Sequence, residues 1–286
     1  VVCPAMHTEM WEHPSVVDNV EVLRSRGVHI VEPEAGRLAG GDNGAGRLAD
    51  SSAIMAAIER ALGPRDLEGV SVVVSAGGTR EPIDAVRVIA NRSSGKQGYA
   101  VAAEAVARGA RVTLVSTVSL ATPAGCKLVE VETAAQMQLA MVSAAIDHDV
   151  IVMSAAVADF RPKIAAPGKL KKRDGAPEIL LEPTPDILAA LGAAKRPGQV
   201  LVGFAAETDD LLANASAKLH AKHLDLIVAN DVSAPEVGFA HDTNAVTILT
   251  PDAEPVEIDL ASKRDVARAV INTIVAIRST HRQDLA

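Results

Sequence analysis

Short apolar runs alternate with longer amphipathic stretches along most of the chain. Val70 to Val74 is rich in β-branched residues and leads into a turn of small residues, Ser75 to Thr79, as buried parallel strands do at their carboxyl edge. Further strands are expected at 112–116, 150–154, 200–204 and 226–228, and helices at 97–108, 133–147, 185–191, 209–222 and 263–277. The runs at 246–249 and 256–258 predict a closing antiparallel pair. This alternation predicts an α/β fold with a mostly parallel sheet.

Local signals mark several helix ends. Thr133 and Gln136 fit a capping box, and Thr184 precedes Pro185 as a cap precedes a proline in the first turn. Ser93 or Ser94 is expected to cap the helix 97–108. A capped amino terminus of this kind favours phosphate.

The first 63 residues have a different pattern. They predict two helices (14–26 and 51–62), one strand (28–31) and a mobile glycine-rich loop (36–46). This amounts to half a domain, and the chain begins as if inside a strand, which suggests an amino-terminal truncation. The polar link from Gly63 to Gly69 divides the chain, so the expected parts are 1–63, a linker 64–69, and 70–286.

Composition excludes several classes of protein. The 286-residue chain is 48% hydrophobic but only 2% aromatic, so Ala, Val, Leu and Ile must build its core. The formal net charge of −8 argues against a general nucleic-acid or membrane-surface binder. Cys3 and Cys126 fit no disulfide framework and are expected to be reduced and partly buried. With no long apolar run or signal peptide, we expect a cytoplasmic protein.

Two turns flank the helix 97–108 and suit an anion. Gly77 and Gly78 let the backbone approach a ligand, and Thr79 adds a hydroxyl. Before the helix, Asn91 to Lys96 forms a second polar turn. A Walker loop is excluded by Ala90 and Gln97, and a dinucleotide fingerprint by the absence of a third glycine after Gly78. A glycine turn without any ligand remains the alternative.

A basic segment follows the strand 150–154. That strand ends in Ala155 to Arg161, with one acid at Asp159, and five cations come next: Lys163, Lys169, Lys171, Lys172 and Arg173. The segment is either a solvated surface hairpin or a flap that closes over a triphosphate.

The stretch from Ser75 to Gly98 closely resembles the nucleotide-binding signature SAGGTxEPIDxVRxIxNxSSGKxG of phosphopantothenoylcysteine synthetase, the CTP-dependent ligase of coenzyme A synthesis. Ala85 stands where bacterial relatives usually have Pro, and Arg92 where many have His. The resemblance implies a Rossmann-like three-layer sandwich and a homodimer. It also implies that 4′-phosphopantothenate and L-cysteine are joined through an acyl-cytidylate, with CTP as co-substrate and Mg²⁺.

The same resemblance assigns roles to particular residues. Asn91 matches the family Asn that converts the acyl-cytidylate, Arg87 an Arg at the same site, and Lys169 the flap lysine that reaches the phosphates. These three are the expected catalytic residues, and the metal ligands are not identified. The expected nucleotide-binding residues are Gly77, Gly78, Ser93, Ser94, Met153, Ser154, Ala155, Asp159, Lys169, Pro185, Asp186, Ile187, Leu188, Phe204 (in GFAAET, 203–208), Lys218 and Lys222.

Residues 1–63 resemble the carboxy-terminal part of the flavoprotein phosphopantothenoylcysteine decarboxylase, fused ahead of the synthetase in many bacteria. The likeness rests on PAMHTEMW, DNVEVLRSRG and GRLAGGDNGAGRL. His7 stands where the family usually has a substrate-contacting Asn, and Gly40 where a proton-donating Cys is frequent. We expect the flavin-binding half to be missing, in line with the suspected truncation. We therefore expect no decarboxylation by this chain, with FMN and higher assembly confined to the full-length protein.

Two other classes remain open. A nicotinamide oxidoreductase on the same architecture is disfavoured because the glycine fingerprint and the ribose-binding acid are missing. A catalytically silent nucleotide-binding or assembly module is not excluded by motifs alone. Cofactor titration tests the first, and turnover with CTP, cysteine and phosphopantothenate tests the second.

Overall fold

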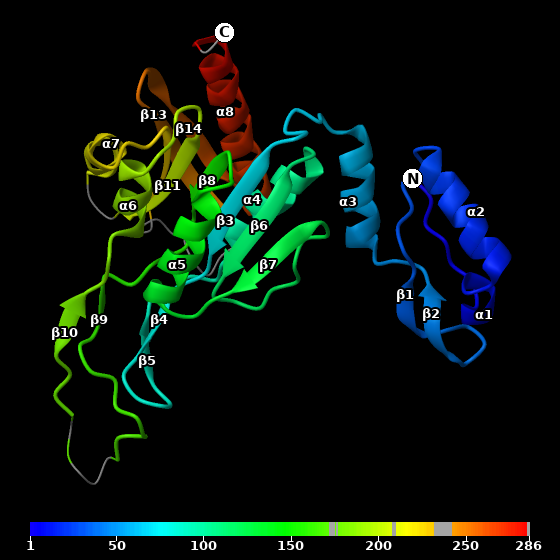
Figure 1. Ribbon diagram of the computed structural model, residues 1–286, viewed down its shortest axis with the longest axis horizontal. Helices are drawn as coiled ribbons and strands as arrows, with labels where there is room; N and C mark the ends of the chain where they lie inside the picture. Colours follow the sequence, from blue (N-terminus) through cyan, green and yellow to red (C-terminus); the bar gives the residue numbers. More distant parts are fainter. Residues whose placement is uncertain (172–174, 176, 208–209, 232–241, 285–286) are drawn as a thin grey trace. The chain divides into compact units, whose positions relative to one another are not determined.

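The computed structural model describes residues 1–171, 175, 177–207, 210–231 and 242–284. The chain divides into two compact units, Val1–Arg65 and Asp66–Ala286 (Figure 1). The division falls within the segment 64–69, where the sequence predicts a linker. Four residues of the sequence-based predictions lie outside the described residues. They are Lys172 and Arg173 of the basic segment, Thr208 of the GFAAET motif, and Asp209 of the helix predicted at 209–222.

Unit 1 contains three helices and a small hairpin among its elements. The helices are α1 (Thr8–Trp11), α2 (Pro14–Ser25) and α3 (Ser51–Leu62), and the strands β1 (Glu34–Arg37) and β2 (Asn43–Arg47) pair antiparallel. The helix predicted at 51–62 is confirmed. Its N-cap is Asp50, whose carboxylate accepts from Ser52 N at 2.8 Å.

Two predictions for unit 1 are wrong. The glycine-rich segment 36–46 is largely the β1–β2 hairpin rather than a loop, because ladder hydrogen bonds use the backbone and need no particular side chain. Gly46 there lies so close to Met6 O that a Cβ would be 2.0 Å from it. The expected strand 28–31 is only an isolated bridge between Val2 and Ile30.

Unit 2 is built on an eight-stranded sheet in the order β14-β13-β12-β11-β8-β3-β6-β7. Its parallel strands are β3 (Ser71–Ala76), β6 (Arg111–Ser116), β7 (Cys126–Glu130), β8 (Val150–Met153), β11 (Val200–Glu207) and β12 (Leu226–Asp231). The antiparallel strands β13 (Thr243–Thr250) and β14 (Ala253–Ser262) close one edge, as predicted.

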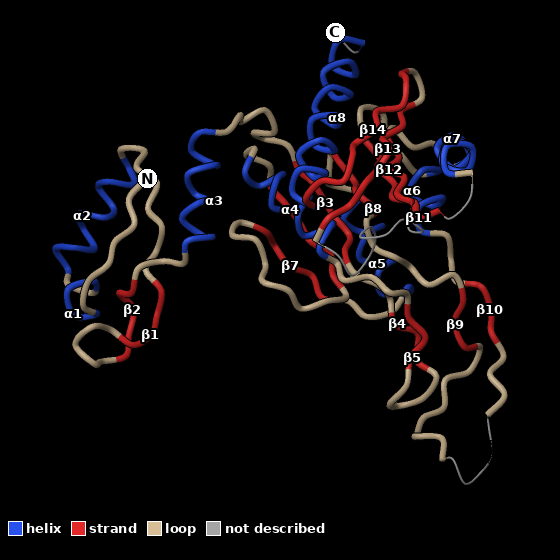
Figure 2. The backbone as a smooth tube through the Cα atoms, turned by 180° about the vertical axis from the view of Figure 1, so that it is seen from behind, coloured by secondary structure: helices blue, strands red, loops and turns tan. Residues whose placement is uncertain are grey.

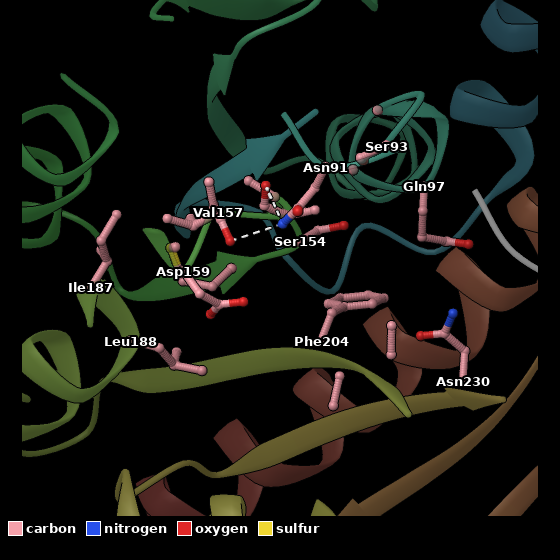
Figure 3. Close-up of a pocket in the computed structure, with 18 of the residues that line it drawn as sticks. Asn91, Ser93, Gln97, Ser154, Val157, Asp159, Ile187, Leu188, Phe204 and Asn230 are labelled. Carbon is pink, nitrogen blue, oxygen red and sulfur yellow. Dashed lines mark hydrogen bonds between the residues drawn. The ribbon is translucent and has the colours of Figure 1, made fainter. Parts of the chain in front are cut away.

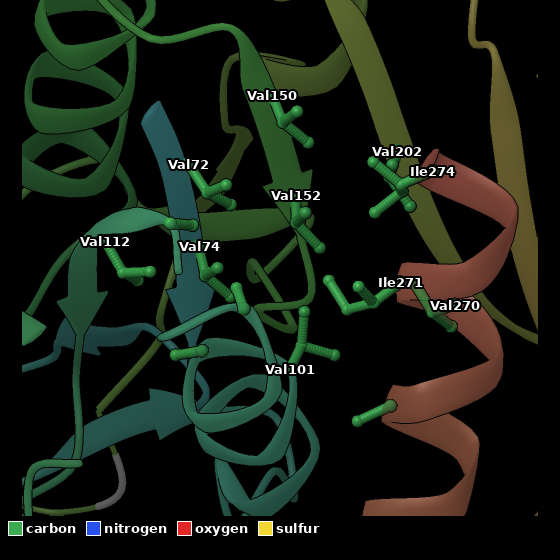
Figure 4. Packing of buried hydrophobic residues seen from close by; sticks show 14 of the residues in the cluster. Val72, Val74, Val101, Val112, Val150, Val152, Val202, Val270, Ile271 and Ile274 are labelled. Carbon is green, nitrogen blue, oxygen red and sulfur yellow. The ribbon is translucent and has the colours of Figure 1, made fainter. Parts of the chain in front are cut away.

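Helices cover both faces of this sheet. The helices α4 (Lys96–Ala107) and α8 (Lys263–Asp284) share one hydrophobic cluster, in which Val74, Val101 and Ile271 are fully buried (Figure 4). The other face packs on α5 (Ala134–Ala145), α6 (Ile187–Ala193) and α7 (Leu211–Ala221). Valine, leucine, isoleucine, alanine and methionine make up most of both clusters. The predicted α/β class and three-layer arrangement are confirmed.

The chain changes direction across the sheet at β3. From β3 it continues to β6 and β7 on one side, and then returns to β8 on the other side of β3. Ligands in open parallel sheets bind beside the carboxyl ends of strands at such a switch point. A ligand site is therefore expected beside the residues that follow β3 and β8.

Two short hairpins extend from the carboxyl end of the sheet (Figure 2). One pairs β4 (Arg80–Pro82) with β5 (Val88–Ala90), and the other pairs β9 (Phe160–Pro162) with β10 (Leu181–Pro183). The predicted basic segment lies between β9 and β10. Its base is tied to the first hairpin, because Ala166 N donates to Ile83 O at 2.9 Å.

The helix caps test the local signals directly. The Thr133–Gln136 capping box of α5 is present as predicted. The cap of α6 is Asp186, not Thr184, because the Thr184 hydroxyl donates to Ala158 O and the helix starts later. The cap of α4 is Gly95, not Ser93 or Ser94, and no side chain caps it. Gly95 has a φ of 75°, a left-handed conformation that favours glycine over serine.

Cys3 and Cys126 are free and partly buried, as expected.

Among the helices in the described part of the chain, none is long and apolar enough to cross a membrane.

Candidate functional site

A pocket of about 500 Å³ lies at the switch point of unit 2. It is bounded by the start of α4, the loop after β8, the start of α6, the ends of β11 and β12, and residues of α7, β13 and α8. Figure 3 shows Ile187 and Leu188 at one side and Gln97 and Asn230 at the other. Asn91, Ser154 and Phe204 lie between them in this view. The pocket thus has two ends and a middle.

The loop after β8 forms the floor of the middle and is held by β3 and its turn. Ser75 Oγ accepts from Ala155 N at 3.0 Å, and Gly77 O accepts from Ala156 N at 2.8 Å. The buried Thr79 hydroxyl accepts from Ala158 N at 2.9 Å. These bonds use the backbone N–H groups of the loop, so its conformation is fixed before any ligand arrives.

Gly77 and Gly78 are needed for this packing. Gly77 has a φ of 88°, and a Cβ there would lie 2.2 Å from Thr117 Oγ1. A Cβ on Gly78 would lie 2.6 Å from Asn91 O. Neither glycine is among the residues that line the pocket. Direct nucleotide binding by these two stays a prediction, while their structural role is clear from the contacts.

Asn91 lines the middle of the pocket. Its side-chain Nδ2 donates to Val157 O at 3.0 Å and lies 3.5 Å from Ala156 O (Figure 3). An amide nitrogen carries two N–H groups, so Asn91 can keep the shorter bond to Val157 O while a ligand replaces the longer contact to Ala156 O.

The start of α4 adds uncapped backbone to the same pocket. Ser93, Ser94 and Gly95 line it, and no side chain accepts from the first N–H groups of the helix. The first N–H groups of a helix have no intrahelical acceptor and favour anions. The serines therefore lie at an anion-friendly position without serving as caps.

The end of the pocket at Ile187 and Leu188 carries paired charges. Asp186 caps α6 through Ala189 N at 3.0 Å and forms an ion pair with Lys222 at 2.8 Å. Partial burial would raise the pKa of Asp186, but the hydrogen bonds from Lys222 and Ala189 outweigh it and leave this pKa below its usual value. Lys218 lies one turn from Lys222, as the helical spacing predicts, and both line the pocket.

Most of the predicted site residues meet in this pocket. The structure brings together Asn91, Ser93, Ser94, Met153, Ser154, Ala155, Asp159, Pro185, Asp186, Ile187, Leu188, Phe204, Lys218 and Lys222. Whether each of them binds a nucleotide stays a prediction.

Arg87 and Lys169 are not among the lining residues. Arg87 donates to the fully buried carboxylate of Asp84 through Nε at 3.0 Å and Nη2 at 2.5 Å, and to Leu170 O at 3.1 Å. Leu170 N also donates to Asp84. The Arg87 hydrogen bond is the main cause that holds the pKa of Asp84 well below its usual range. Arg87 therefore anchors the base of the basic segment, while Lys169 is exposed on that segment.

Several lining residues were not predicted as site residues, and five of them carry amide or ammonium side chains: Lys96, Gln97, Asn230, Asn244 and Lys263. Lys96 is the last residue of the predicted polar turn and Gln97 follows it, so their place beside that turn was a signal in the sequence. Asn230 lies near the end of strand β12, while Asn244 and Lys263 reach the pocket only because β13 and β14 return antiparallel and α8 follows.

In unit 1, His7 and Gly40 are neighbours. A Cβ on Gly40 would lie 2.6 Å from His7 Cε1, so the histidine side chain occupies the space beside position 40. His7 also precedes α1 at its cap position, where its side chain makes no capping bond. The two departures from the decarboxylase pattern are therefore in contact and depend on each other sterically.

Family models match both parts of the chain. Residues 67–277 match the model described as DNA/pantothenate metabolism flavoprotein C-terminal domain. Residues 1–63 match the model described as Flavoprotein.

Curated relatives match nearly the whole chain. The coenzyme A biosynthesis bifunctional protein CoaBC of Mycobacterium tuberculosis (strain H37Rv) is 46% identical over 289 residues, covering 95% of this chain and 69% of that protein. The CoaBC protein of Bacillus subtilis is 45% identical over 281 residues, covering 96% and 69%. A crystal structure of the C-terminal domain of a CoaBC protein is 39% identical, with a TM-score of 0.65, and covers 76% of this chain and 99% of that one.

Proposed function

The chain belongs to the CoaBC family of bifunctional coenzyme A biosynthesis proteins, and from this premise we propose that unit 2 is a CTP-dependent phosphopantothenate–cysteine ligase. It joins the carboxylate of 4′-phosphopantothenate to the amine of L-cysteine through an acyl-cytidylate. The observation that carries the proposal is the two-ended pocket, in which Asn91 lies between the Ile187 and Leu188 side and the Gln97 side.

Activation of the carboxylate requires two anions to approach each other. We assign the nucleotide to the end with Ile187 and Leu188, where Lys218 and Lys222 give positive charge, and Phe204 in the middle of the pocket adds an apolar surface. From this end the phosphates would extend toward the uncapped start of α4, which would stabilise their charge as it shifts during the reaction. These groups are held in place by the fold, so they need little rearrangement when the reaction begins.

Magnesium fits this arrangement as an ion carried by the triphosphate. Among the described residues there is no cluster of three or more His, Cys, Asp or Glu side chains that could hold a metal alone. Mg²⁺ is usually held by one or two carboxylates together with phosphates and water, and Asp159 and Asp186 both line the pocket. The ion would supply charge neutralisation at the phosphates.

Transfer to cysteine requires a donor at the tetrahedral oxyanion. We assign this to Asn91, whose amide is neutral and is fixed by Val157 O at 3.0 Å. Lys169 is assigned to phosphate binding in a closed form of the basic segment. Arg87 is assigned to the base of that segment, through Asp84 and Leu170.

We further infer that residues 1–63 correspond to the end of the flavoprotein decarboxylase half. FMN and decarboxylation are expected of the two-part proteins of this family. In this chain Gly40 offers no acidic side chain and His7 fills the neighbouring space, so decarboxylation is not expected. We place the ligase in the cytoplasm and propose that it is a homodimer through unit 2, with higher assembly through a complete decarboxylase half.

The test is turnover of the purified chain with CTP, Mg²⁺, 4′-phosphopantothenate and L-cysteine, with diphosphate, CMP and product measured separately. We expect product with CTP and much slower turnover with ATP. Equal rates with the two nucleotides would contradict the CTP assignment. Hydride transfer to a nicotinamide cofactor, or nucleotide binding without any turnover, would establish one of the alternative classes instead.

The basic segment has its own test. Lys169→Ala should slow diphosphate release while leaving the thermal unfolding midpoint unchanged, since Lys169 is exposed. Lys163→Ala, at another exposed lysine of the same segment, is the matched control. Unchanged turnover of Lys169→Ala at saturating CTP would make the segment a surface hairpin.

A further inference from the structure

The end of the pocket opposite Ile187 and Leu188 holds side chains that the proposed chemistry has not yet used. Four of them define what we call the Lys96–Lys263 end: Lys96, Gln97, Asn244 and Lys263. Figure 3 shows Gln97 and Asn230 on this side, across Asn91 and Ser154 from the nucleotide end.

Three elements that are distant in the sequence meet at the Lys96–Lys263 end. Gln97 Nε2, on α4, donates to Lys263 O at the start of α8 at 3.0 Å. Lys263 N in turn donates to Asp242 O at 3.1 Å, and the Asp242 carboxylate pairs with Lys96. Asn244 follows two residues later on β13 and is only 5% exposed. The end is therefore built by tertiary contacts rather than by one loop.

Two acceptor oxygens at this end have no donor in the described part of the chain. They are Gln97 Oε1 and Asn244 Oδ1, and both are buried. The Gln97 amide nitrogen is already committed to Lys263 O, which fixes where its oxygen points. Buried polar atoms normally have a partner, so these two oxygens call for a ligand that donates hydrogen bonds.

The same end is positively charged. Lys263 is only 8% exposed, and burial, followed by the nearby charge of Lys96, lowers its pKa, while Asp242 acts in the opposite direction. The two ammonium groups thus repel each other. A ligand carboxylate between them would relieve this repulsion.

The two oxygens require hydrogen-bond donors and the two lysines favour an anion, so a suitable ligand must carry both kinds of group. A phosphate would satisfy the lysines but would give the two oxygens no hydrogen. Sugar hydroxyls would satisfy the oxygens but leave the lysines without a new anion. An α-amino acid carries both groups on one carbon: an amine that donates and a carboxylate that pairs.

We propose that the Lys96–Lys263 end is the amino-acid subsite of the ligase, with Gln97 Oε1 and Asn244 Oδ1 accepting from the amine and the two lysines holding the carboxylate. This rests on the proposed function, in which the amino acid is L-cysteine. The neutral amine attacks the carboxyl carbon of the acyl-cytidylate, a C–N bond forms, and the C–O bond to phosphate breaks. CMP leaves with the bonding electrons, and the amine proton passes to solvent.

The position of Asn91 agrees with this direction of attack. Asn91 lies between the two ends in Figure 3, so an amine held near Gln97 and a nucleotide held near Leu188 approach the carbonyl from opposite sides. The oxyanion donor would then lie beside the bond that changes.

The experiment compares half-reactions in the full chain. Lys263→Met and Asn244→Ala should raise KM for L-cysteine by about 10-fold or more, while diphosphate release without cysteine changes by less than about 2-fold. Lys218→Met, at the nucleotide end, is the matched control and should raise KM for CTP instead. If wild-type protein releases no diphosphate, the proposed function has failed, not this subsite.

Cysteamine, which is L-cysteine without its carboxylate, gives a second readout. Wild-type protein should prefer L-cysteine by about 10-fold or more, and Lys263→Met should reduce that preference toward unity. A variant that instead raises KM for CTP or for phosphopantothenate would assign this end to a phosphate and overturn the proposal. So would variants that keep both the KM for cysteine and the preference over cysteamine. Lys96→Met, at a side chain that is 42% exposed, provides the same test if the buried variants fail to fold.

Discussion

The turn after β3, residues 77–79, and the turn before α4, residues 93–95, have similar sequences and different places in the structure. Both combine glycine with a hydroxyl residue beside a helix. The first is buried under Thr117 and the loop after β8, whereas the second lines the pocket. Glycine in a turn therefore indicates close backbone packing. Whether the turn can contact a ligand depends on whether it lines the pocket.

The two turns also act on the site by different routes. The first holds the backbone of the loop after β8, through Gly77 O and the Thr79 hydroxyl. The second offers helix N–H groups directly, with Asn91 just before it. We expect changes in the first turn to lower stability and changes around the second to affect the reaction.

The largest effect is expected at Asn91. Asn91→Ala should leave diphosphate release intact but slow transfer to cysteine by about 10²–10³, roughly 3–4 kcal/mol of barrier, because the oxyanion loses its donor. Quenching and mass spectrometry should show acyl-cytidylate accumulating with little CMP. Arg92→Ala, at the exposed neighbouring residue, is the control. Loss of diphosphate release in Asn91→Ala would assign Asn91 to the first step.

In the buried turn, Gly77→Ala should lower the free energy of unfolding by about 2–3 kcal/mol. An alanine must adopt a φ of 88° and place its Cβ 2.2 Å from Thr117 Oγ1. Gly69→Ala is the matched control, since Gly69 has a φ of 77° but open space around it. Urea unfolding of both variants separates steric overlap from backbone strain, and equal losses would show that the overlap is relieved at no cost.

Much of unit 2 could be predicted from its sequence because burial imposes a recognisable pattern of apolar residues. The central residues of strands β3, β6, β8 and β11 are mostly apolar, since both faces of the sheet are covered. The three-residue strands of the β4–β5 and β9–β10 hairpins have no comparable apolar pattern. Three of them contain a proline, which does not suggest a strand: Pro82, Pro162 and Pro183.

The site was predictable only in part, for a related reason. Its residues on motif segments, such as Asp159 and Phe204, could be proposed one by one from the resemblance. Asn244 and Lys263 carry no local signal, because their place in the pocket follows from the antiparallel return of β13 and β14. Arg87 was placed at the site by analogy, yet its guanidinium is engaged by Asp84 and Leu170.

A smaller effect is expected from Thr79→Val, which keeps the shape of the side chain. It removes the acceptor of Ala158 N inside a fully buried site, so we expect a loss of about 1–2 kcal/mol in the free energy of unfolding. Because the loop after β8 is also released, kcat should fall while the helix content seen by circular dichroism stays the same. Thr247→Val, at a buried threonine of β13, is the control. A fall in stability with unchanged kcat would show that the loop does not depend on this hydroxyl.

The smallest effect, and the sharpest contrast between the turns, is expected at Ser93 and Ser94. Neither serine caps α4, so Ser93→Ala and Ser94→Ala should each change the free energy of unfolding by less than about 0.5 kcal/mol. Thr133→Ala is the matched control, because it breaks a true capping box on α5 and should cost about 1 kcal/mol. Both serines line the pocket, so the same variants should raise KM for CTP even though their stability is unchanged. If either serine variant loses as much stability as Thr133→Ala, the hydroxyl supports the fold, and the second turn resembles the first more closely than its place in the pocket suggests.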